Sequence, residues 1–150
     1  MTPAALRSYL HDHIPLSGAM GVEVVDASAG VVMLDAPLAP NLNMHGTMFG
    51  GSAATLALLA AWSVVHLRLE AEGLANQLVI HRTEMEYLRP IDGTARAVAR
   101  FDADWGAFQR TFSRHGRARL TVTAELWFKG QVAGRLLGEF VAISERDRPQ

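Results

Sequence analysis

The sequence predicts an α+β domain in which a mainly antiparallel sheet packs around one long buried helix. An apolar, alanine-rich stretch from about Gly50 to about Glu72 has the length of a long helix. Segments on both sides of it alternate apolar and polar residues, which is typical of strands with one buried face. Short turn sequences join these segments, and such hairpins give antiparallel pairing.

The segment before the long helix is expected to contain a short helix and two strands. Thr2 is a suitable N-cap and Pro3 a suitable first helical residue, and Pro15 ends the helix that they begin. Valines supply the β-branched content of two expected strands, over residues 18–26 and 31–37, with a turn between them.

The long helix is apolar nearly all round until Arg68, so it should be buried on most sides. Gly73 ends it, and alternation then predicts strands over residues 77–88 and 94–101. Residues 102–116 break the alternation and are read as a short helix or an ordered loop. A closing hairpin follows over residues 117–128 and 131–143, with Lys129-Gly130 at its turn. We expect a single domain over residues 1–150.

Composition excludes several classes of protein. Apolar residues make up 49% of 150 residues and the formal net charge is -1, which favours a globular domain over a nucleic-acid or anionic-membrane partner. The chain has no cysteine, which excludes disulfides and thiolate sites. The first ten residues do not resemble a secretory signal, and residues 53–65 are too few to cross a bilayer. We expect a cytoplasmic protein without a membrane partner.

Metal and cofactor sites are not expected. His11 and His13 are too close in sequence to share a helix face, and no carboxylate cluster completes a metal site. The residues therefore suggest no metal and no cofactor.

The segment from Pro40 to Ser52 is the most informative one. It is a polar, glycine-rich loop that opens onto the first turn of the buried helix, where N–H groups lack internal partners and the dipole favours negative charge. Gly50 and Gly51 leave room for a carbonyl oxygen to approach those groups, as in an oxyanion hole. Asn43 and His45 are polar groups able to orient a substrate or a water molecule.

The chain resembles the hotdog-fold acyl-CoA thioesterases, in particular the branch often found fused to an acetyltransferase domain. The resemblance lies in Asn43, Gly46, Thr47, Gly50 and Gly51, within the run from His45 to Ser52, and in Tyr87-Leu88-Arg89-Pro90. It implies a hotdog fold, hydrolysis of an acyl-CoA or another acyl thioester, and a homodimer or dimer of dimers with sites shared between protomers. Exposed sheet edges independently favour self-association.

The sequence departs from that family at two positions. Many relatives carry histidine where Phe49 lies and an acid near Leu58, and that acid serves as general base or nucleophile. Here no acidic residue occurs between Gly51 and Arg68. His45 is therefore the first candidate base, because imidazole has a suitable pKa and lies beside the expected oxyanion site. His81 or Glu84, brought across a dimer interface, are the alternatives.

Each candidate also has a structural reading. Asn43 is predicted to be catalytic with His45, but an Asx-turn and a loop-stabilising hydrogen bond are the alternatives. Gly50 and Gly51 alternatively form a tight turn. The alternative for His81 is a hydrogen-bonded core histidine on the same strand face as Met85, and the alternative for Glu84 is an ion pair with Arg82. The predicted oxyanion and substrate-binding residues are Thr47, Phe49, Gly50, Gly51, Ser52, His81, Glu84 and Tyr87.

Arginines cluster between residues 110 and 119 without matching acids. A solvated face is the common use of such a run, and the alternative is that Arg114 and Arg117 bind the phosphates of coenzyme A. The resulting interpretation is an acyl-CoA thioesterase. A non-catalytic acyl-thioester binding or sensing module is the first alternative, and a hotdog hydratase or dehydratase is the second.

Overall fold

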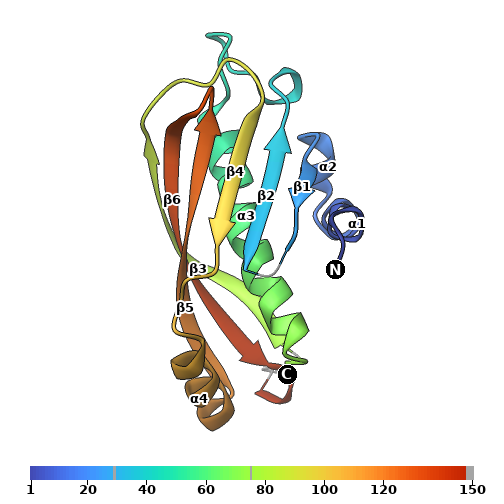
Figure 1. The fold of residues 1–150 in the computed structure, drawn as a ribbon, viewed down its shortest axis with the longest axis vertical. Helices are drawn as coiled ribbons and strands as arrows, with labels where there is room; N and C mark the ends of the chain where they lie inside the picture. Colours follow the sequence, from blue (N-terminus) through green and yellow to red (C-terminus); the bar gives the residue numbers. More distant parts are fainter. Residues whose placement is uncertain (29, 75, 148–150) are drawn as a thin grey trace.

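A computed structural model describes residues 1–28, 30–74 and 76–147, which form one six-stranded antiparallel sheet with helices (Figure 1). The strand order is β1-β2-β4-β5-β6-β3, so β1 and β3 are the sheet edges. The strands are β1 (Glu23–Asp26), β2 (Val31–Ala36), β3 (Asn76–Tyr87), β4 (Ala95–Arg100), β5 (Arg117–Phe128) and β6 (Gln131–Ser144). The helices are α1 (Pro3–His13), α2 (Pro15–Ala19), α3 (Gly50–Ala71) and α4 (Trp105–His115), with 3-10 turns η1 (Ala39–Asn41) and η2 (Glu145–Asp147).

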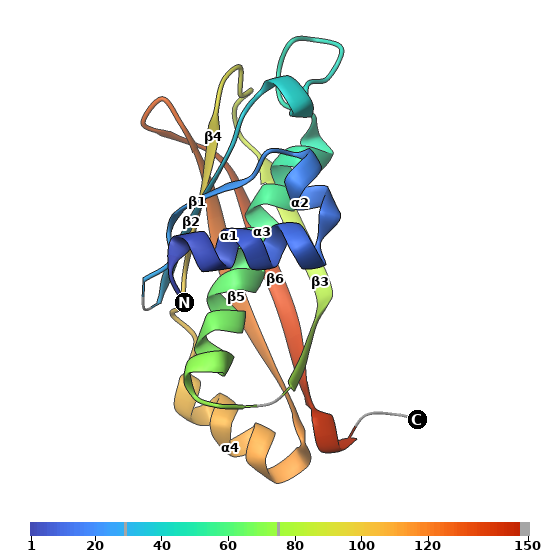
Figure 2. The same ribbon diagram turned by 90° about the vertical axis from the view of Figure 1, so that its right-hand side faces the viewer.

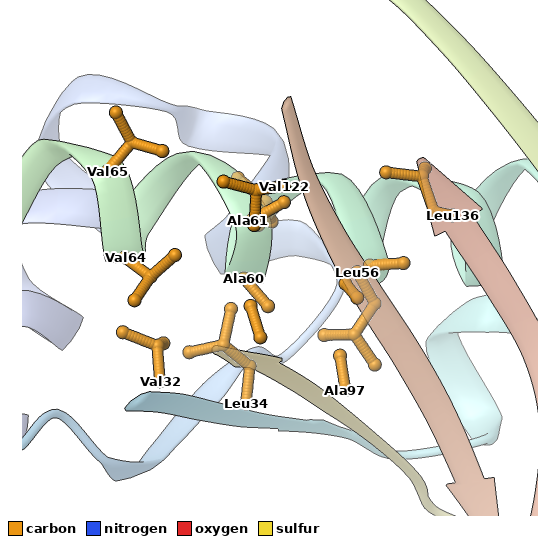
Figure 3. Close-up of a cluster of buried hydrophobic side chains, with 14 of the residues drawn as sticks. Val32, Leu34, Leu56, Ala60, Ala61, Val64, Val65, Ala97, Val122 and Leu136 are labelled. Atoms are coloured by element: carbon orange, nitrogen blue, oxygen red, sulfur yellow. The ribbon is translucent and has the colours of Figure 1, made fainter. Parts of the chain in front are cut away.

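The long helix α3 forms the core with the sheet, as the sequence predicted. Leu56, Ala60 and Val64 recur every four residues, so they share one helix face. Figure 3 shows this face directed at side chains of β2 and β4, including Val32, Leu34 and Ala97. By length and composition α3 would also be able to span a bilayer, but here it is packed against the sheet. Truncating a fully buried leucine of this core is expected to cost about 2–5 kcal/mol.

The N-terminal segment differs from the prediction. Thr2 caps α1 through a 3.1 Å hydrogen bond from the Ala5 N–H, as expected. The strand predicted over residues 18–26 is wrong in its first half, because Pro15 begins the short helix α2 and only Glu23–Asp26 pairs as β1. Proline favours the first turn of a helix as readily as it ends one, and Ser17 stabilises this turn by donating to the Ile14 carbonyl at 2.8 Å.

A β-bulge interrupts β3 between Ile80 and Arg82, where the pairing with β6 shifts by one residue. Because one extra residue reverses the alternation of faces, His81 does not share the inner face of Met85. Its side chain is 54% exposed, and Nε2 lies 3.9 Å from Glu139, on the face away from α3. The reading of His81 as a buried core histidine is therefore wrong.

Residues 102–116, which the sequence predicted to be either a short helix or an ordered loop, contain the helix α4. Asp104 caps it by accepting from the Ala107 N–H at 3.0 Å, and Gly116 ends it with a φ of 70°. Phe108 and Phe112 are buried. Helix α4 lies at one end of the sheet, and the loop before α3 lies at the other end (Figure 1).

Candidate functional site

The loop before α3 is organised by the side chain of Asn43. Its Oδ1 accepts from the N–H groups of His45 at 2.8 Å and Thr47 at 3.1 Å, and its Nδ2 donates to Thr47 Oγ1 at 2.8 Å. Gly46, with a φ of 76°, completes the turn. The Asn43 carboxamide thus makes its hydrogen bonds inside the loop, as in the Asx-turn alternative.

Asn41 attaches this loop to the rest of the domain. It is 2% exposed, and its Nδ2 donates to the carbonyls of Met20 at 2.9 Å and Pro37 at 2.7 Å. Its own carbonyl accepts from the Phe49 N–H at 2.7 Å, directly before α3. Sequence reasoning missed Asn41, because nothing in a polar loop distinguishes a buried asparagine from a solvated one.

The first turn of α3 has free donors. Phe49 occupies the N-cap position and gives no side-chain hydrogen bond. Within the part of the chain that the structure describes, the N–H groups of Gly50, Gly51 and Ser52 have no acceptor. A 22-residue helix also places the positive end of its dipole there. The arrangement suits an oxygen atom with partial or full negative charge.

Two aromatic rings flank these donors. The Phe49 ring lies so close to Gly51 that a Cβ there would be 2.5 Å from its Cε1 atom. On the other side, the Tyr87 hydroxyl donates to the Gly50 carbonyl at 2.9 Å, and its ring would be 3.4 Å from a Cβ on Gly50. Both rings remain more than half exposed. Gly51 therefore lets the Phe49 ring lie against the helix start, whereas a side chain at Gly50 would be in ordinary contact with the Tyr87 ring.

An apolar cavity of about 290 Å³ adjoins the first turn of α3. Its walls come from the loop, the helix, the end of β3 and the β5–β6 pair: Met48, Ala53, Tyr87, Leu88, Arg89, Pro90, Ile91, Leu126 and Ala133. Arg89 is the cationic residue of this lining, and the lining includes no carboxylate. Apart from Arg89, the cavity offers hydrocarbon and aromatic surface, which suits an apolar ligand group.

The structure brings most predicted site residues together. Those in the loop and first turn of α3, with Tyr87 opposite, form one neighbourhood: Asn43, His45, Thr47, Phe49, Gly50, Gly51, Ser52 and Tyr87. The His45 side chain is exposed, and its imidazole makes no hydrogen bond with the described residues.

The remaining predicted residues lie away from this neighbourhood in the same chain. Glu84 and His81 precede Tyr87 on β3 by about 10 and 20 Å, at about 3.3 Å per residue. Glu84 is held by Arg82 at 2.7 Å, as its structural reading predicted. Arg117 begins β5, about 30 Å along that strand from Leu126 in the cavity wall, and Arg114 is farther back on α4.

Over residues 1–28, 30–74 and 76–147, no group of three or more His, Cys, Asp or Glu side chains is arranged to hold a metal ion. The polar groups of the loop and of the first turn of α3 include backbone donors, the Thr47 and Ser52 hydroxyls and the exposed His45 imidazole.

Comparisons with known proteins identify the family of this chain. The family described as "Putative thioesterase (yiiD_Cterm)" matches residues 3–144. A putative esterase from Halobacterium salinarum is 38% identical over 94 residues, which are 60% of this chain and only 61% of that protein.

Solved structures show the same fold. A protein of unknown function from Chlorobaculum tepidum is 28% identical, with a TM-score of 0.89 over 96% of this chain and 98% of that one. A putative thioesterase from Shewanella oneidensis is 28% identical, with a TM-score of 0.83 over 94% and 96%. A Haemophilus influenzae thioesterase, 13% identical, shares the fold with a TM-score of 0.80 over 100% and 96%. The architecture is the hotdog fold that the resemblance implied. Since the family match spans nearly the whole chain, the chain belongs to the putative thioesterase (yiiD_Cterm) family.

Proposed function

We propose that this protein hydrolyses an acyl thioester, with coenzyme A as the carrier, to a free acid and a thiol. One observation carries the proposal: the free N–H groups of residues 50–52 open beside an apolar cavity of about 290 Å³. The first feature suits a thioester carbonyl and the second suits its acyl chain. Membership of the thioesterase family supports the same reaction.

In the proposed reaction, the thioester carbonyl oxygen accepts hydrogen bonds from the first turn of α3. Water attacks the carbonyl carbon, and the negative charge that develops on the oxygen is stabilised by donors already in place. One such donor contributes about 10²–10³ in rate in well-studied hydrolases. A general base removes a proton from the attacking water. Collapse of the tetrahedral intermediate then breaks the carbon–sulfur bond, and the leaving thiolate takes this proton from the base as the acid is released.

The acyl chain is assigned to the cavity between α3 and the end of β3. This cavity measures about 290 Å³ and opens to solvent. Tyr87 and Phe49 border the carbonyl end, on either side of the glycine pair. Displacement of water from this apolar surface contributes to substrate binding.

His45 is the proposed general base. It belongs to the loop that leads into α3, and its imidazole is exposed and free to bind a water molecule. Asn43 is proposed to hold this loop in shape, because its carboxamide bonds the backbone of His45 and Thr47. His81 and Glu84 lie on the edge strand β3, so they would act on the site of a partner chain.

The test is thiol release from acyl-CoAs of increasing chain length, measured on the wild type and on His45→Ala. A fall in kcat of at least tenfold, about 1.4 kcal/mol, with an unchanged melting temperature is expected. His13→Ala is the matched control, because that histidine is exposed on α1, where it bonds the Tyr9 carbonyl and stacks on the Tyr9 ring. Unchanged turnover in His45→Ala would transfer the base role to His81 or Glu84.

A second candidate function is binding of an acyl thioester without turnover. The absence of any carboxylate from the cavity lining favours it, because the usual helix acid of the family is missing. A wild type that binds acyl-CoA in calorimetry but releases no thiol from any chain length would establish this alternative.

A further inference from the structure

A second cavity meets the first at the segment after β3, and it opens on the outer face of the sheet, away from α3. It measures about 590 Å³, and Leu88 and Arg89 belong to the walls of both cavities. Its lining is Leu88, Arg89, Trp127, Gly130, Gln131, Val132 and Arg135. The Leu88 and Arg89 N–H groups both donate to the Ala133 carbonyl, at 2.9 and 3.1 Å, which fixes the segment that borders both spaces.

The second cavity is cationic and aromatic. Arg89 is exposed and makes no ion pair within the described chain, and Arg135 has a carboxylate partner, Glu125, only at 3.6 Å. The side chains of this pair are 49% and 39% exposed, so solvent screens it and a stronger anion is able to replace it. Trp127 adds an indole to the same wall. Guanidinium groups beside an aromatic ring suit a phosphate attached to a nucleobase.

We propose that this second cavity binds the phosphate-bearing part of the acyl carrier, with Arg89 and Arg135 on the phosphates and Trp127 against the nucleobase. The inference rests on the proposed function, because it assumes that the acyl group enters the cavity at the start of α3. Coenzyme A and the phosphopantetheine arm of a carrier protein share the phosphate. The indole favours coenzyme A, since only that carrier has a base to stack.

The arginines predicted from the sequence form a separate surface. Arg117 lines a cavity of about 790 Å³ with Thr111, His115 and Arg119, and this cavity shares no residue with the one at the start of α3. Glu139 lies 3.5 Å from Arg119 and partly neutralises that surface. Within one chain, Arg89 is therefore the arginine that a ligand leaving the acyl cavity meets first.

The decisive experiment compares two thioesters with the same acyl group, one on coenzyme A and one on N-acetylcysteamine, which lacks phosphate and base. Arg89→Gln and Arg135→Gln are each expected to lower kcat/KM for the acyl-CoA at least tenfold, mainly through KM. For the N-acetylcysteamine thioester, Arg135→Gln is expected to stay within twofold of the wild type, because Arg135 lines the second cavity and not the acyl cavity. Arg89 lines both cavities, so Arg89→Gln is expected to lose activity on this thioester too, but by a smaller factor than on the acyl-CoA. Arg110→Gln is the matched control, because Arg110 is exposed on α4, at the other end of the sheet (Figure 1).

Three outcomes would overturn the proposal. Equal losses on both thioesters would show that Arg89 acts on the fold or the acyl group. A wild type that shows no preference for the coenzyme A thioester would leave the cationic cavity without a role. A carrier-specific loss in Arg117→Gln, with Arg89→Gln unaffected, would move the phosphate site to the end of the sheet near α4.

A binding measurement separates this inference from the proposed hydrolysis. If the wild type hydrolyses no thioester, coenzyme A itself is titrated by calorimetry against wild type, Arg89→Gln and Trp127→Ala. Affinity at least tenfold weaker in both variants would support the cavity although the hydrolase proposal had failed. Phosphopantetheine is the comparison ligand, and Trp127→Ala should leave its affinity unchanged. No binding of millimolar coenzyme A to the wild type would overturn the inference.

Discussion

Glycine at position 51 is required by the Phe49 ring more than by the helix backbone. A Cβ at this position would be 2.5 Å from the ring, so the ring must turn away in Gly51→Ala. We expect a loss in kcat/KM of at least tenfold, because the methyl group and the displaced ring both occupy space beside the free N–H groups. Stability should change by less than about 1 kcal/mol, since the ring is 57% exposed and alanine favours helix.

The measurement is thiol release together with thermal unfolding of Gly51→Ala. The same substitution in a Phe49→Ala background should cost less, because the ring contact is then absent. Equal costs in both backgrounds would show that the ring contact is unimportant, and unchanged activity in Gly51→Ala would place the oxyanion site elsewhere.

Two substitutions of Asn43 test whether its side chain shapes the loop or contacts the substrate. Asn43→Asp keeps the oxygens that accept from the His45 and Thr47 N–H groups, and the Thr47 hydroxyl is able to donate to the new carboxylate. We expect Asn43→Asp to keep kcat/KM within about threefold. Asn43→Ala should lose at least tenfold in kcat/KM and about 1.5–4.5 kcal/mol of unfolding free energy, at about 0.5–1.5 kcal/mol for each of three lost hydrogen bonds. Equal damage in both variants would indicate that the carboxamide N–H groups contact the substrate.

At the scale of the elements, helix α1 crosses α3 (Figure 2), and the rings of Tyr9, Trp62 and His66 stack between the two helices. The His66 ring centroid lies 4.9 Å from that of Tyr9 and 4.6 Å from that of Trp62. Its Nε2 is buried and has no hydrogen-bond partner among the residues that the structure describes. Burial lowers the pKa of His66; nearby Glu70 opposes this shift and His13 adds to it. The folded chain therefore prefers the neutral imidazole.

This preference predicts a pH dependence of stability. A histidine with a lowered pKa stabilises the fold fully above its unfolded pKa, about 6.5, and this contribution is lost as pH falls below that value. We expect the melting temperature of the wild type to fall between pH 7 and pH 5 by more than that of His66→Gln. Parallel pH profiles for the two proteins would show that His66 protonation is not coupled to the packing of α1.

The elements themselves were largely predictable, and the exceptions have identifiable causes. The long helix, the closing hairpin and the antiparallel pairing follow from periodicity and turn residues, which act locally. The bulge beside His81 is a mismatch between two strands, so the sequence of β3 alone does not reveal it. Likewise, Pro15 is compatible with ending α1 and with starting α2, and packing makes it do both.

At the scale of the whole molecule, the site depends on contacts between distant segments. Tyr87 and Gly50 are 37 residues apart and meet through one hydrogen bond. The family resemblance identified both the loop before α3 and the segment from Tyr87 to Pro90 as parts of the site. Composition and spacing alone identified only the start of the helix. The second cavity was not predicted, because Trp127, Arg135 and Arg89 come together only when β5, β6 and the segment after β3 are assembled. The arginine-rich run, which was conspicuous in the sequence, lies at the far end of the sheet.

The sheet has one open edge, and this predicts the assembly. Helix α1 packs beside the β1 edge, where Arg7 bonds Glu23 at 2.6 Å and His11 bonds the Val22 carbonyl at 2.8 Å. The 12-residue strand β3 forms the other edge, and β6 is its only partner within the described chain. We expect β3 to pair with β3 of a second copy, because a long strand edge otherwise leaves its backbone groups unpaired. Sedimentation velocity at micromolar concentration should then give twice the chain mass, and a monomer would contradict the prediction.

A shared site adds a stricter test of this dimer. If Glu84 acts on the neighbouring chain, each site uses His45 of one protomer and Glu84 of the other. His45→Ala and Glu84→Gln then each remove one of these two groups. A refolded equal mixture of the two variants should regain about a quarter of wild-type activity, because about half of the dimers are mixed and each has one intact site. Arg82→Gln is the matched control for the loss of the Arg82–Glu84 ion pair. A dimer without complementation would show that each chain carries a complete site, with His45 acting in its own protomer.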